Sequence, residues 1–303
     1  MADSLKLAAL DLANYTGETW VKNIRGGVLS RLAPQAPEIK VGSTDHFTFT
    51  GTPKAELVGE SAQKSSQDGT PGKVTAKTYK VQVTYRFSNE VQWSDEDYQT
   101  GLVDGLVASI AIALNRALDL IAIHGVNPLT GEVATQVSEY FTRAGNGVHR
   151  VTAGASADGD LEAMAAALQG SGYMATGIGF DPTYAGVLAR SRDDQGRKLY
   201  PELGLGFGFD NFQGLAAASS DTVSGRQELA AGEATLKAIM GDFNAFKWGV
   251  AREIPLELIE FGDPDGNGDL KRTNEVAIRA ESVLGYAIFD PAAFALTEGA
   301  ALS

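Results

Sequence analysis

The residues best suited to chemistry form one acidic cluster near the C-terminus. Asp263, Asp265, Asn267 and Asp269 alternate with proline and glycine in the segment DPDGNGD. This spacing matches the first seven positions of an EF-hand loop, whose oxygen ligands suit calcium. The twelfth position is Asn274, where such a loop needs a bidentate glutamate.

The flanks of this cluster favour another interpretation. PLELIEF before it and EVAIRAE after it alternate like strands, whereas an EF-hand loop lies between two helices. Asp, Asn and Gly between alternating runs are also the residues that a hairpin turn requires. The sequence therefore predicts a plain turn without a metal, and a calcium-dependent binding module is the alternative.

Other catalytic chemistry has little support. The chain has no cysteine, which excludes disulfides, thiolate nucleophiles and cysteine-ligated zinc. Its three histidines, His46, His124 and His149, are scattered and are expected to be packing residues, and no G-x-S-x-G motif frames a serine nucleophile. The glycines of GLGFG at 204–208 fit neither phosphate-binding spacing. We expect a protein that is not an enzyme and has no cofactor.

The net charge of -13 is unevenly distributed. Residues 1–90 carry 11 Lys and Arg against 9 Asp and Glu, while the rest of the chain carries 14 against 29. An acidic body disfavours direct binding to nucleic acid, because affinity for phosphates comes from clustered Lys and Arg. The imbalance either serves solubility or lets a basic arm reach an acidic neighbour made of the same chain.

The chain gives no reason to expect a membrane. No uninterrupted apolar run approaches the length of a membrane span, and MADSLKLAALDLANY lacks the basic start and apolar middle of a signal peptide. We therefore expect synthesis in the cytoplasm.

A polar arm, residues 41–87, has no core of its own. At about 3.3 Å per residue its returning limb, 73–87, spans about 50 Å, against a radius of gyration of about 19 Å for a compact chain of this length. The limb must cross the globule or leave it. Residues 59–73 hold no large apolar side chain apart from Pro71, so the tip cannot support its own ordering. A disordered loop on an ordinary enzyme is the alternative.

Alternation predicts a half-buried strand in the returning limb, with Tyr79, Val81, Val83, Tyr85 and Phe87 on one face.

A long helix is predicted to follow the arm over residues 94–124. Ser94 with Asp97 resembles a capping box, Gly125 would close the helix, and the apolar residues between them form one stripe. Such a helix would be about 45 Å long, beyond the mean for globular proteins.

The remainder of the chain has mixed character, typical of an α+β protein. We expect a helix over 160–169, a strand over 175–180, and Asp181 with Pro182 as N-cap and first-turn residues of a helix through Arg190. Later strands are predicted at 215–218, 236–240, 247–252, 256–261, 275–281 and 284–289.

This order of parts resembles the major capsid protein of tailed bacteriophages, which has the Hong Kong 97, or Johnson, fold. Each matching stretch is weak alone, but the stretches are collinear and cover most of the chain. They are VGESAQK at 58–64, SNE at 88–90, GIGFDP at 177–182, RKLY at 197–200, GDF at 241–243, and NEVAIRAESVLGYAIFDP at 274–291 followed by AAF.

The resemblance implies an α+β, Hong Kong 97-like capsid fold with four parts. These are an N-terminal arm at 1–40, an extended two-stranded loop at 41–88, a peripheral domain at 89–156 and 245–303 built on the spine helix 94–124, and a mixed α/β axial domain at 157–244.

The resemblance also implies self-assembly through hexamers and pentamers into an icosahedral shell. The shell would be a virion capsid, assembled in the bacterial host cytoplasm, that encloses double-stranded DNA without sequence-specific binding. Each arm would lie across a neighbour's spine helix and become ordered there. A portal is an implied partner and a decoration protein an allowed one. If Met1 is the native start, no long removable segment precedes the arm, which implies a separate scaffolding protein.

Some members of this family join subunits by an isopeptide bond between a lysine and an asparagine, with a glutamate as proton acceptor. Lys64, Asn274 and Glu281 occupy the matching positions here. The reaction needs a lysine neutralised by burial, and Arg279 and Glu253 are expected to place charges nearby. We therefore expect non-covalent closure. A second function on the same fold is the encapsulin, a cellular nanocompartment shell that loads an enzyme instead of DNA.

Overall fold

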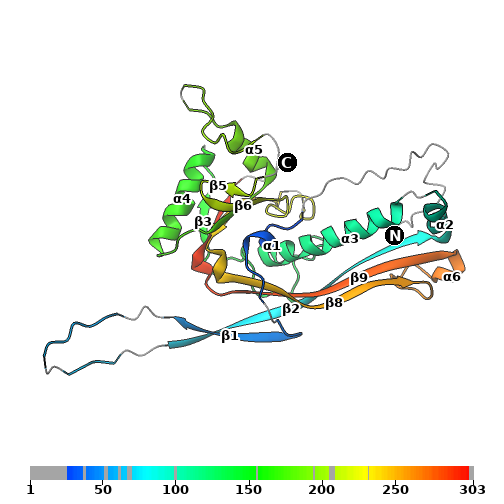
Figure 1. The fold of residues 1–303 in the computed structure, drawn as a ribbon, viewed down its shortest axis with the longest axis horizontal. Coiled ribbons are helices and arrows are strands. Elements are labelled where there is room, and N and C mark those ends of the chain that lie inside the picture. The colour runs from blue at the N-terminus through cyan, green and yellow to red at the C-terminus, as the bar shows by residue number, and fades with distance from the viewer. Residues whose placement is uncertain are drawn as a thin grey trace.

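Two sheets and one long helix organise the chain (Figure 1). The structure is a computed structural model. It describes residues 26–36, 39–50, 54–60, 63–66, 70–98, 101–154, 156–193, 195–204, 209–230 and 232–299.

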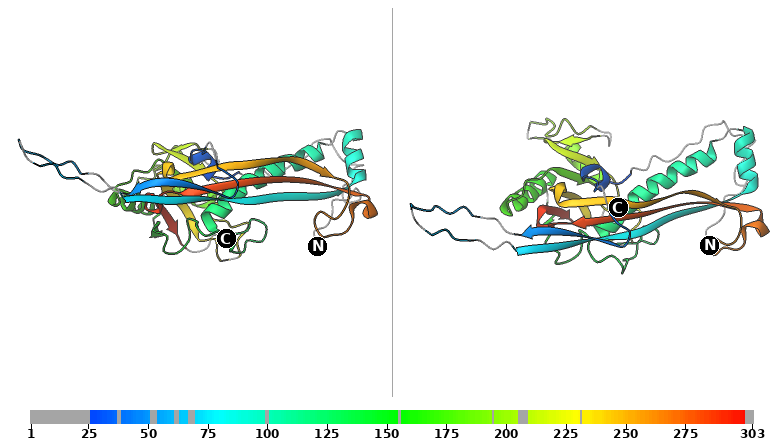
Figure 2. Two further views of the ribbon diagram at one scale, coloured as in Figure 1. Left: turned by 90° about the horizontal axis from the view of Figure 1, so that it is seen from below. Right: turned by 60° about the horizontal axis from the view of Figure 1, so that its bottom comes forward.

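The first sheet has four antiparallel strands in the order β1-β2-β9-β8. One strand, β2, joins the arm to the body: it pairs with β1 up to Lys77 and with β9 from Lys77 onward. In every view the described residues between β1 and β2, 54–60 and 63–66, therefore project beyond the two sheets (Figures 1 and 2). The strands are β1 Ser43–Thr50, β2 Thr70–Ser88, β8 Phe246–Ile259 and β9 Glu275–Ile288.

The alternation predicted for β2 is confirmed. Val83 and Phe87 pack with the long helix in one apolar cluster, and Tyr79 and Val81 pack against the main core. Tyr85 lies on the same face and is 37% exposed.

The four strands predicted near the C-terminus are two long ones. β8 covers the first predicted segment and the second as far as Ile259, with irregularities between Val250 and Arg252 and between Ile254 and Glu257. A bulge shifts the alternation of side chains by one residue, which made one strand resemble two. β9 pairs with β2 without any irregularity.

The single helix expected over 94–124 is corrected in two respects. Helical structure already begins at Asn89, directly after β2, so Ser94 is a buried residue inside α2 and not a cap. A new helix then starts after Gly101, whose φ of 63° suits glycine and interrupts α-helical geometry. The segments are α2 Asn89–Tyr98, α3 Leu102–Asp119 and a π-helical turn, η3 Leu120–His124.

The second sheet is mixed, with the order β3-β10-β7-β4-β6-β5. The pairs β3–β10 and β4–β6 are parallel and the others antiparallel. Its strands are β3 His149–Thr152, β4 Gly177–Phe180, β5 Asn211–Phe212, β6 Leu215–Ser219, β7 Leu236–Gly241 and β10 Phe294–Glu298.

Two helices pack on this sheet, α4 Ala157–Gly170 and α5 Pro182–Arg190. The predicted cap of α5 is confirmed, because the Asp181 carboxylate accepts a hydrogen bond from the Thr183 amide at 2.7 Å. Short helices elsewhere in the described residues are α1 Leu29–Leu32, α6 Leu270–Thr273 and the 3₁₀ turns η4 Phe243–Ala245 and η5 Pro291–Ala293.

The six-stranded sheet extends beyond the axial domain expected over 157–244. Both β3 and β10 pair within it, although they come from segments assigned to the peripheral domain. The two sheets also share one core, in which the Phe141 ring lies 4.8 Å from that of Phe294 on β10 and 5.4 Å from that of Phe246 on β8.

The long helix is unusually apolar. Val103–His124 is long and apolar enough to span a membrane by length and composition, although half of this stretch is buried in the fold. It also carries buried charged residues, Arg116 and Asp119, that bind other parts of the chain. These contacts indicate a core helix, and most of its apolar residues between Val103 and Leu114 are only partly buried.

The shared core yields a stability prediction. Phe294→Ala should lower the free energy of unfolding by about 3–5 kcal/mol, because it leaves a cavity among fully buried rings. Phe47→Ala is the control, since this side chain is 78% exposed, and should change it by less than about 0.5 kcal/mol. Denaturant unfolding of unassembled subunits measures both, and equal effects would contradict a core shared by the two sheets.

Candidate functional site

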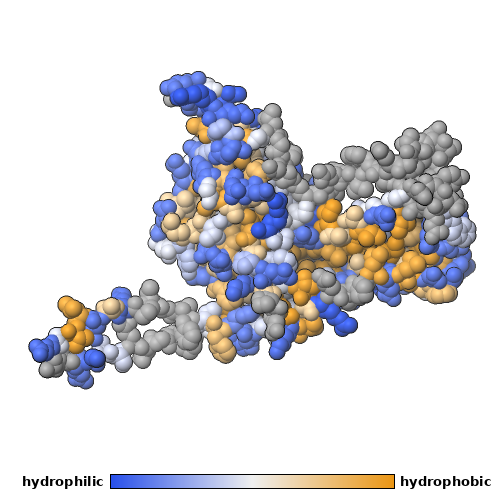
Figure 3. All heavy atoms as spheres, in the orientation of Figure 1, coloured by the Kyte–Doolittle hydropathy of each residue, from blue (hydrophilic) through white to orange (hydrophobic). Residues whose placement is uncertain are grey.

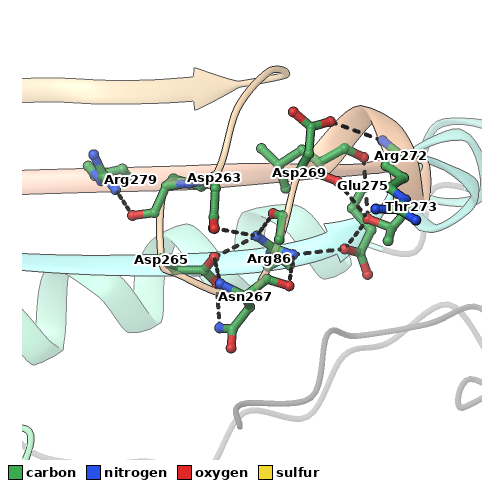
Figure 4. A network of polar contacts seen from close by, with 12 residues as sticks. Arg86, Asp263, Asp265, Asn267, Asp269, Arg272, Thr273, Glu275 and Arg279 are labelled. Atoms are coloured by element: carbon green, nitrogen blue, oxygen red, sulfur yellow. Dashed lines mark hydrogen bonds and ion pairs between the residues drawn. The ribbon is translucent and has the colours of Figure 1, made fainter.

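The acidic turn lies between β8 and α6, beside the end of β2 (Figure 4). A single side chain from β2, that of Arg86, enters it. This side chain is only 7% exposed.

The guanidinium of Arg86 is surrounded by oxygen atoms of the turn. Its Nη2 lies 2.5 Å from Asp265 Oδ1 and 2.8 Å from the Gly268 carbonyl. Its Nη1 lies 3.2 Å from Glu275 Oε2 and 3.4 Å from the Asn267 carbonyl. Asp263 Oδ1 is 3.5 Å from Nη2. The position that a cation would occupy in this loop is therefore filled by a cation of the same chain.

The predicted calcium ligands are only partly brought together. Asp263, Asp265 and Asn267 converge on Arg86, while Asp269 is the N-cap of α6 and accepts a hydrogen bond from the Arg272 amide at 3.1 Å. Among the residues that the structure describes, no group of three or more His, Cys, Asp or Glu residues could hold a metal ion. The guanidinium in the turn is consistent with the plain-turn interpretation, and the absence of a metal stays a prediction.

The turn also perturbs the acidity of Asp265. Burial alone would raise the pKa of this carboxyl, but hydrogen bonds from Asn267 and the charge of Arg86 hold the pKa below its usual value. A carboxyl with a lowered pKa stabilises the fold at neutral pH, and this contribution is lost as the pH falls through the lowered value.

The three residues matched to the isopeptide reaction do not meet within one chain. Lys64 lies in the exposed loop tip, Asn274 ends α6, and Glu281 lies midway along β9. The tip and α6 are at opposite ends of the molecule (Figure 1). Any meeting of Lys64 with Asn274 therefore requires two subunits.

The side-chain amide of Asn274 is engaged within its own subunit. Its Nδ2 donates to Glu90 Oε1 at 2.6 Å, and its Oδ1 accepts from Asn89 Nδ2 at 2.9 Å. The Glu90 carboxylate accepts a hydrogen bond from its own backbone amide and another from the Asn274 side chain, and both bonds lower the pKa of Glu90. Asn274 has a left-handed backbone with φ of 56°, which asparagine adopts more readily than other residues with side chains.

The charged residues expected near the reaction lie beside Glu281: Arg279 is two residues before it on β9, and Glu253 on β8 is in register with Ser282. Glu281 pairs with Lys80 at 2.7 Å. Arg279 donates to the Pro264 carbonyl at 2.6 Å, and the charged group bonded to Asn274 is Glu90. The side chain of Glu253 lies outside the part of the chain described in detail.

The loop tip presents apolar side chains to solvent. Leu57 is fully exposed and Val58 is 36% exposed, and Figure 3 shows apolar surface at the tip. Ser65 donates to Glu56 Oε2 through its amide at 3.1 Å and its hydroxyl at 2.6 Å, which holds the two limbs together there. Of the glycine motif at 204–208, residues 205–208 lie outside the described residues.

A second apolar surface lies along α3 and the neighbouring strands (Figure 3). Tyr85, Ile278 and Leu258 are in register across β2, β9 and β8. Ile278 is buried in the cluster that includes residues of α3, whereas Leu258 is 45% exposed. The helix therefore covers the middle of this sheet face and leaves its β8 side open.

Comparisons with known proteins agree with this architecture. Residues 25–299 match the phage capsid family. A solved structure from Mycobacterium phage Ogopogo is 39% identical, with 98% of this chain and 100% of that chain covered and a TM-score of 0.82. A solved structure from Gordonia phage Cozz is 32% identical, with 95% of this chain and 91% of that chain covered and a TM-score of 0.79. A capsid structure of an empty GTA particle, 18% identical over 93% of this chain and 94% of that chain, shares the fold with a TM-score of 0.60. A comparison with curated proteins gives no match.

The acidic turn yields the second prediction. Arg86→Gln should lower the free energy of unfolding by about 3–5 kcal/mol, because it leaves the carboxylates of Asp265 and Glu275 together without their buried cation. Denaturant unfolding measures the change. Wild-type stability should not depend on calcium or on a chelator, because the guanidinium already fills the turn.

The exposed Arg192→Gln is the control for the loss of one positive charge and should leave the unfolding midpoint unchanged. A wild-type protein that is stabilised by calcium and destabilised by a chelator would contradict the plain turn. So would an Arg86 variant as stable as the control.

Proposed function

We propose, from the premise that this chain belongs to the phage capsid family and is a structural major capsid protein, that its copies join head to tail through the arm. The capsid assemblies among its structural neighbours imply self-association into a shell. Hexamers and pentamers around packaged DNA are the finer part of the proposal. The observation that carries it is the separation of two apolar surfaces, at the arm tip and beside α3.

Two apolar surfaces at distant places on one chain favour a heterologous contact, in which each copy uses its tip and the next copy uses its body. The tip offers Leu57 without any cover from its own chain. The partly buried apolar residues of α3 and the exposed Leu258 on β8 offer apolar area that one subunit leaves partly open (Figure 3). Repetition of such a contact around an axis closes a ring.

The balance of charge suits a container. The body of the chain beyond residue 90 is strongly acidic, and a wall that bound phosphates tightly would hinder DNA from entering and leaving. We therefore propose that the shell encloses DNA without sequence-specific contacts. Assembly in the host cytoplasm with a portal and a scaffolding protein belongs to the same proposal. The encapsulin alternative is not favoured by the family match, and nucleic acid or an enzyme recovered inside purified particles separates the two.

We also propose that the arm contact is non-covalent. Both polar atoms of the Asn274 amide are already bonded to Asn89 and Glu90, and Glu281 is paired with Lys80. Lys64 lies in an exposed tip, whereas nucleophilic attack requires an uncharged amine.

The arm contact yields the third prediction. Leu57→Asp should reduce assembly of shells at least tenfold at equal protein concentration, because it places a charge in an apolar contact. The thermal midpoint of the unassembled subunit should not change, because Leu57 has no cover within its own chain. Electron microscopy and sedimentation measure assembly. Ser66→Asp adds the same charge at an exposed position of the same tip and should assemble normally, and equal loss in both variants would argue against an apolar contact at Leu57.

Denaturing electrophoresis gives the fourth prediction. Assembled shells boiled in detergent should run as one band at 31.9 kDa. A ladder of higher bands in the wild type that disappears with Lys64→Arg would show that the subunits are cross-linked after all.

A further inference from the structure

A buried polar junction connects the end of the long helix to the six-stranded sheet. It consists of residues 219–229, which follow β6, and of the side chains that bind this segment. Within it Ser219, Ser220, Asp221, Thr222 and Ser224 are all buried. Burial of so many polar groups is costly unless each is bonded, so the geometry of this segment is specified by its partners.

Three side chains of the long helix bind this segment. Arg116 donates to both carboxylate oxygens of Asp221, at 2.7 and 3.2 Å, and to Glu228 at 2.5 Å. Asp119, fully buried, accepts from the Thr222 hydroxyl at 2.6 Å. His124 Nε2 lies 3.1 Å from the Thr222 carbonyl and 3.0 Å from that of Val223.

The π-turn explains how Asp119 and His124 reach the same segment. Residues five apart in an α-helix, with about 3.6 residues per turn, point about 140° away from each other. The wider turn of Leu120–His124, with bonds from i to i+5, brings such a pair onto nearly the same side. Thr222 then contacts both residues.

The same junction holds two further segments. Asp119 also accepts hydrogen bonds from the amides of Val28 and Leu29 at the start of α1, at 2.5 and 3.0 Å. Ser224 donates to Asp181 Oδ2 at 2.6 Å, and Asp181 is the N-cap of α5. Rotation between the long helix and the sheet would disturb these bonds together.

We propose that this junction is a proton-sensitive hinge, in which His124 is the group whose protonation releases residues 219–229 from the helix. With Nε2 facing only carbonyl oxygens among its described contacts, the neutral ring donates a hydrogen bond and satisfies the site. A second proton puts a charge on a buried ring, 9% exposed, without a carboxylate bonded to it, and opening of the hinge returns that charge to water.

The neighbouring ionisable groups do not supply a counter-charge to His124. Asp221 and Glu228 are paired with Arg116, and Asp181 lies 3.8 Å from Arg226. Asp119 is bonded to Thr222 and to the start of α1. Burial lowers the pKa of His124 from 6.5 to about 4. A lowered histidine pKa stabilises the closed hinge above about pH 6.5, and this contribution is lost as the pH falls toward 4.

Asp119 acts in the opposite direction. Burial raises the pKa of this carboxyl above its usual value, so its contribution to stability is present at low pH and is lost as the pH rises through the raised value. The two groups therefore require separate variants.

Use of the hinge in a shell rests on the proposed function, because one chain that fills five-fold and six-fold rings must adjust the angle between its parts.

Hydrogen exchange of the unassembled full chain tests the hinge. After correction for intrinsic rates, opening of residues 219–229 and of the amides of Val28 and Leu29 should increase about fifty-fold from pH 7 to pH 4.5, because each unit of pKa difference is a factor of ten. Amides in the β2–β9 pair should keep their protection. His124→Gln retains a donor without a titrating ring and should lose most of the increase, while Asp119→Asn should make the increase steeper.

His149→Gln is the matched control, since this histidine is only partly buried and contacts Ser171, and it should behave like the wild type. Equal opening at both pH values in the wild type would overturn the hinge, and so would an unchanged increase in His124→Gln. Because the experiment uses unassembled subunits, its outcome is independent of shell formation. A chain that never forms shells but opens as expected would contradict the proposed function alone.

Discussion

The pairing of β2 with two different partners is the constraint on which the rest of the structure depends. The 19-residue strand binds β1 at one end and β9 at the other, and Lys77 is the only residue of β2 in register with both. Its β9 half is supported by the apolar cluster beneath α3, while its β1 half belongs to a ribbon whose isolated stability in water is marginal at best. Because the strand is continuous, the body fixes the direction in which the arm projects.

This division of one strand explains why the chain leaves apolar surface uncovered both at the arm tip and beside α3. A compact monomer would fold the arm back over α3, which would bury Leu57 and the open side of the helix in the same contact. The rigid pairing of β2 with β9 directs the tip away from that surface (Figure 1). In the proposed head-to-tail contact, another copy would cover the apolar area that one copy leaves open, and this burial would offset the free energy of ordering the tip.

Patterns local in sequence predicted local structure well. The alternation in β2, the Asp181 cap of α5 and the strands at β6 and β7 depend on neighbouring residues and were recognisable without the fold. The π-turn was not, because the side chains that flank it, Asp119 and His124, bind Thr222, about a hundred positions away. The role of Arg86 was hidden for the same reason. On the polar face of a strand it resembled the exposed Lys80 and Gln82, and only the packing of the acidic turn against β2 shows that it is buried.

The acidic turn and the polar junction use the same physical solution at the two ends of the long helix. Each places an arginine among carboxylates that come from distant parts of the chain, Arg86 with Asp265 and Glu275, and Arg116 with Asp221 and Glu228. Apolar residues of similar volume could give equal or greater stability. Oriented charges instead restrict the geometry, because an arginine that loses one carboxylate leaves a buried charge unpaired. Both sites fix the orientation of segments that flank the helix, and a subunit that repeats many times in a closed shell depends on that orientation more than on added stability.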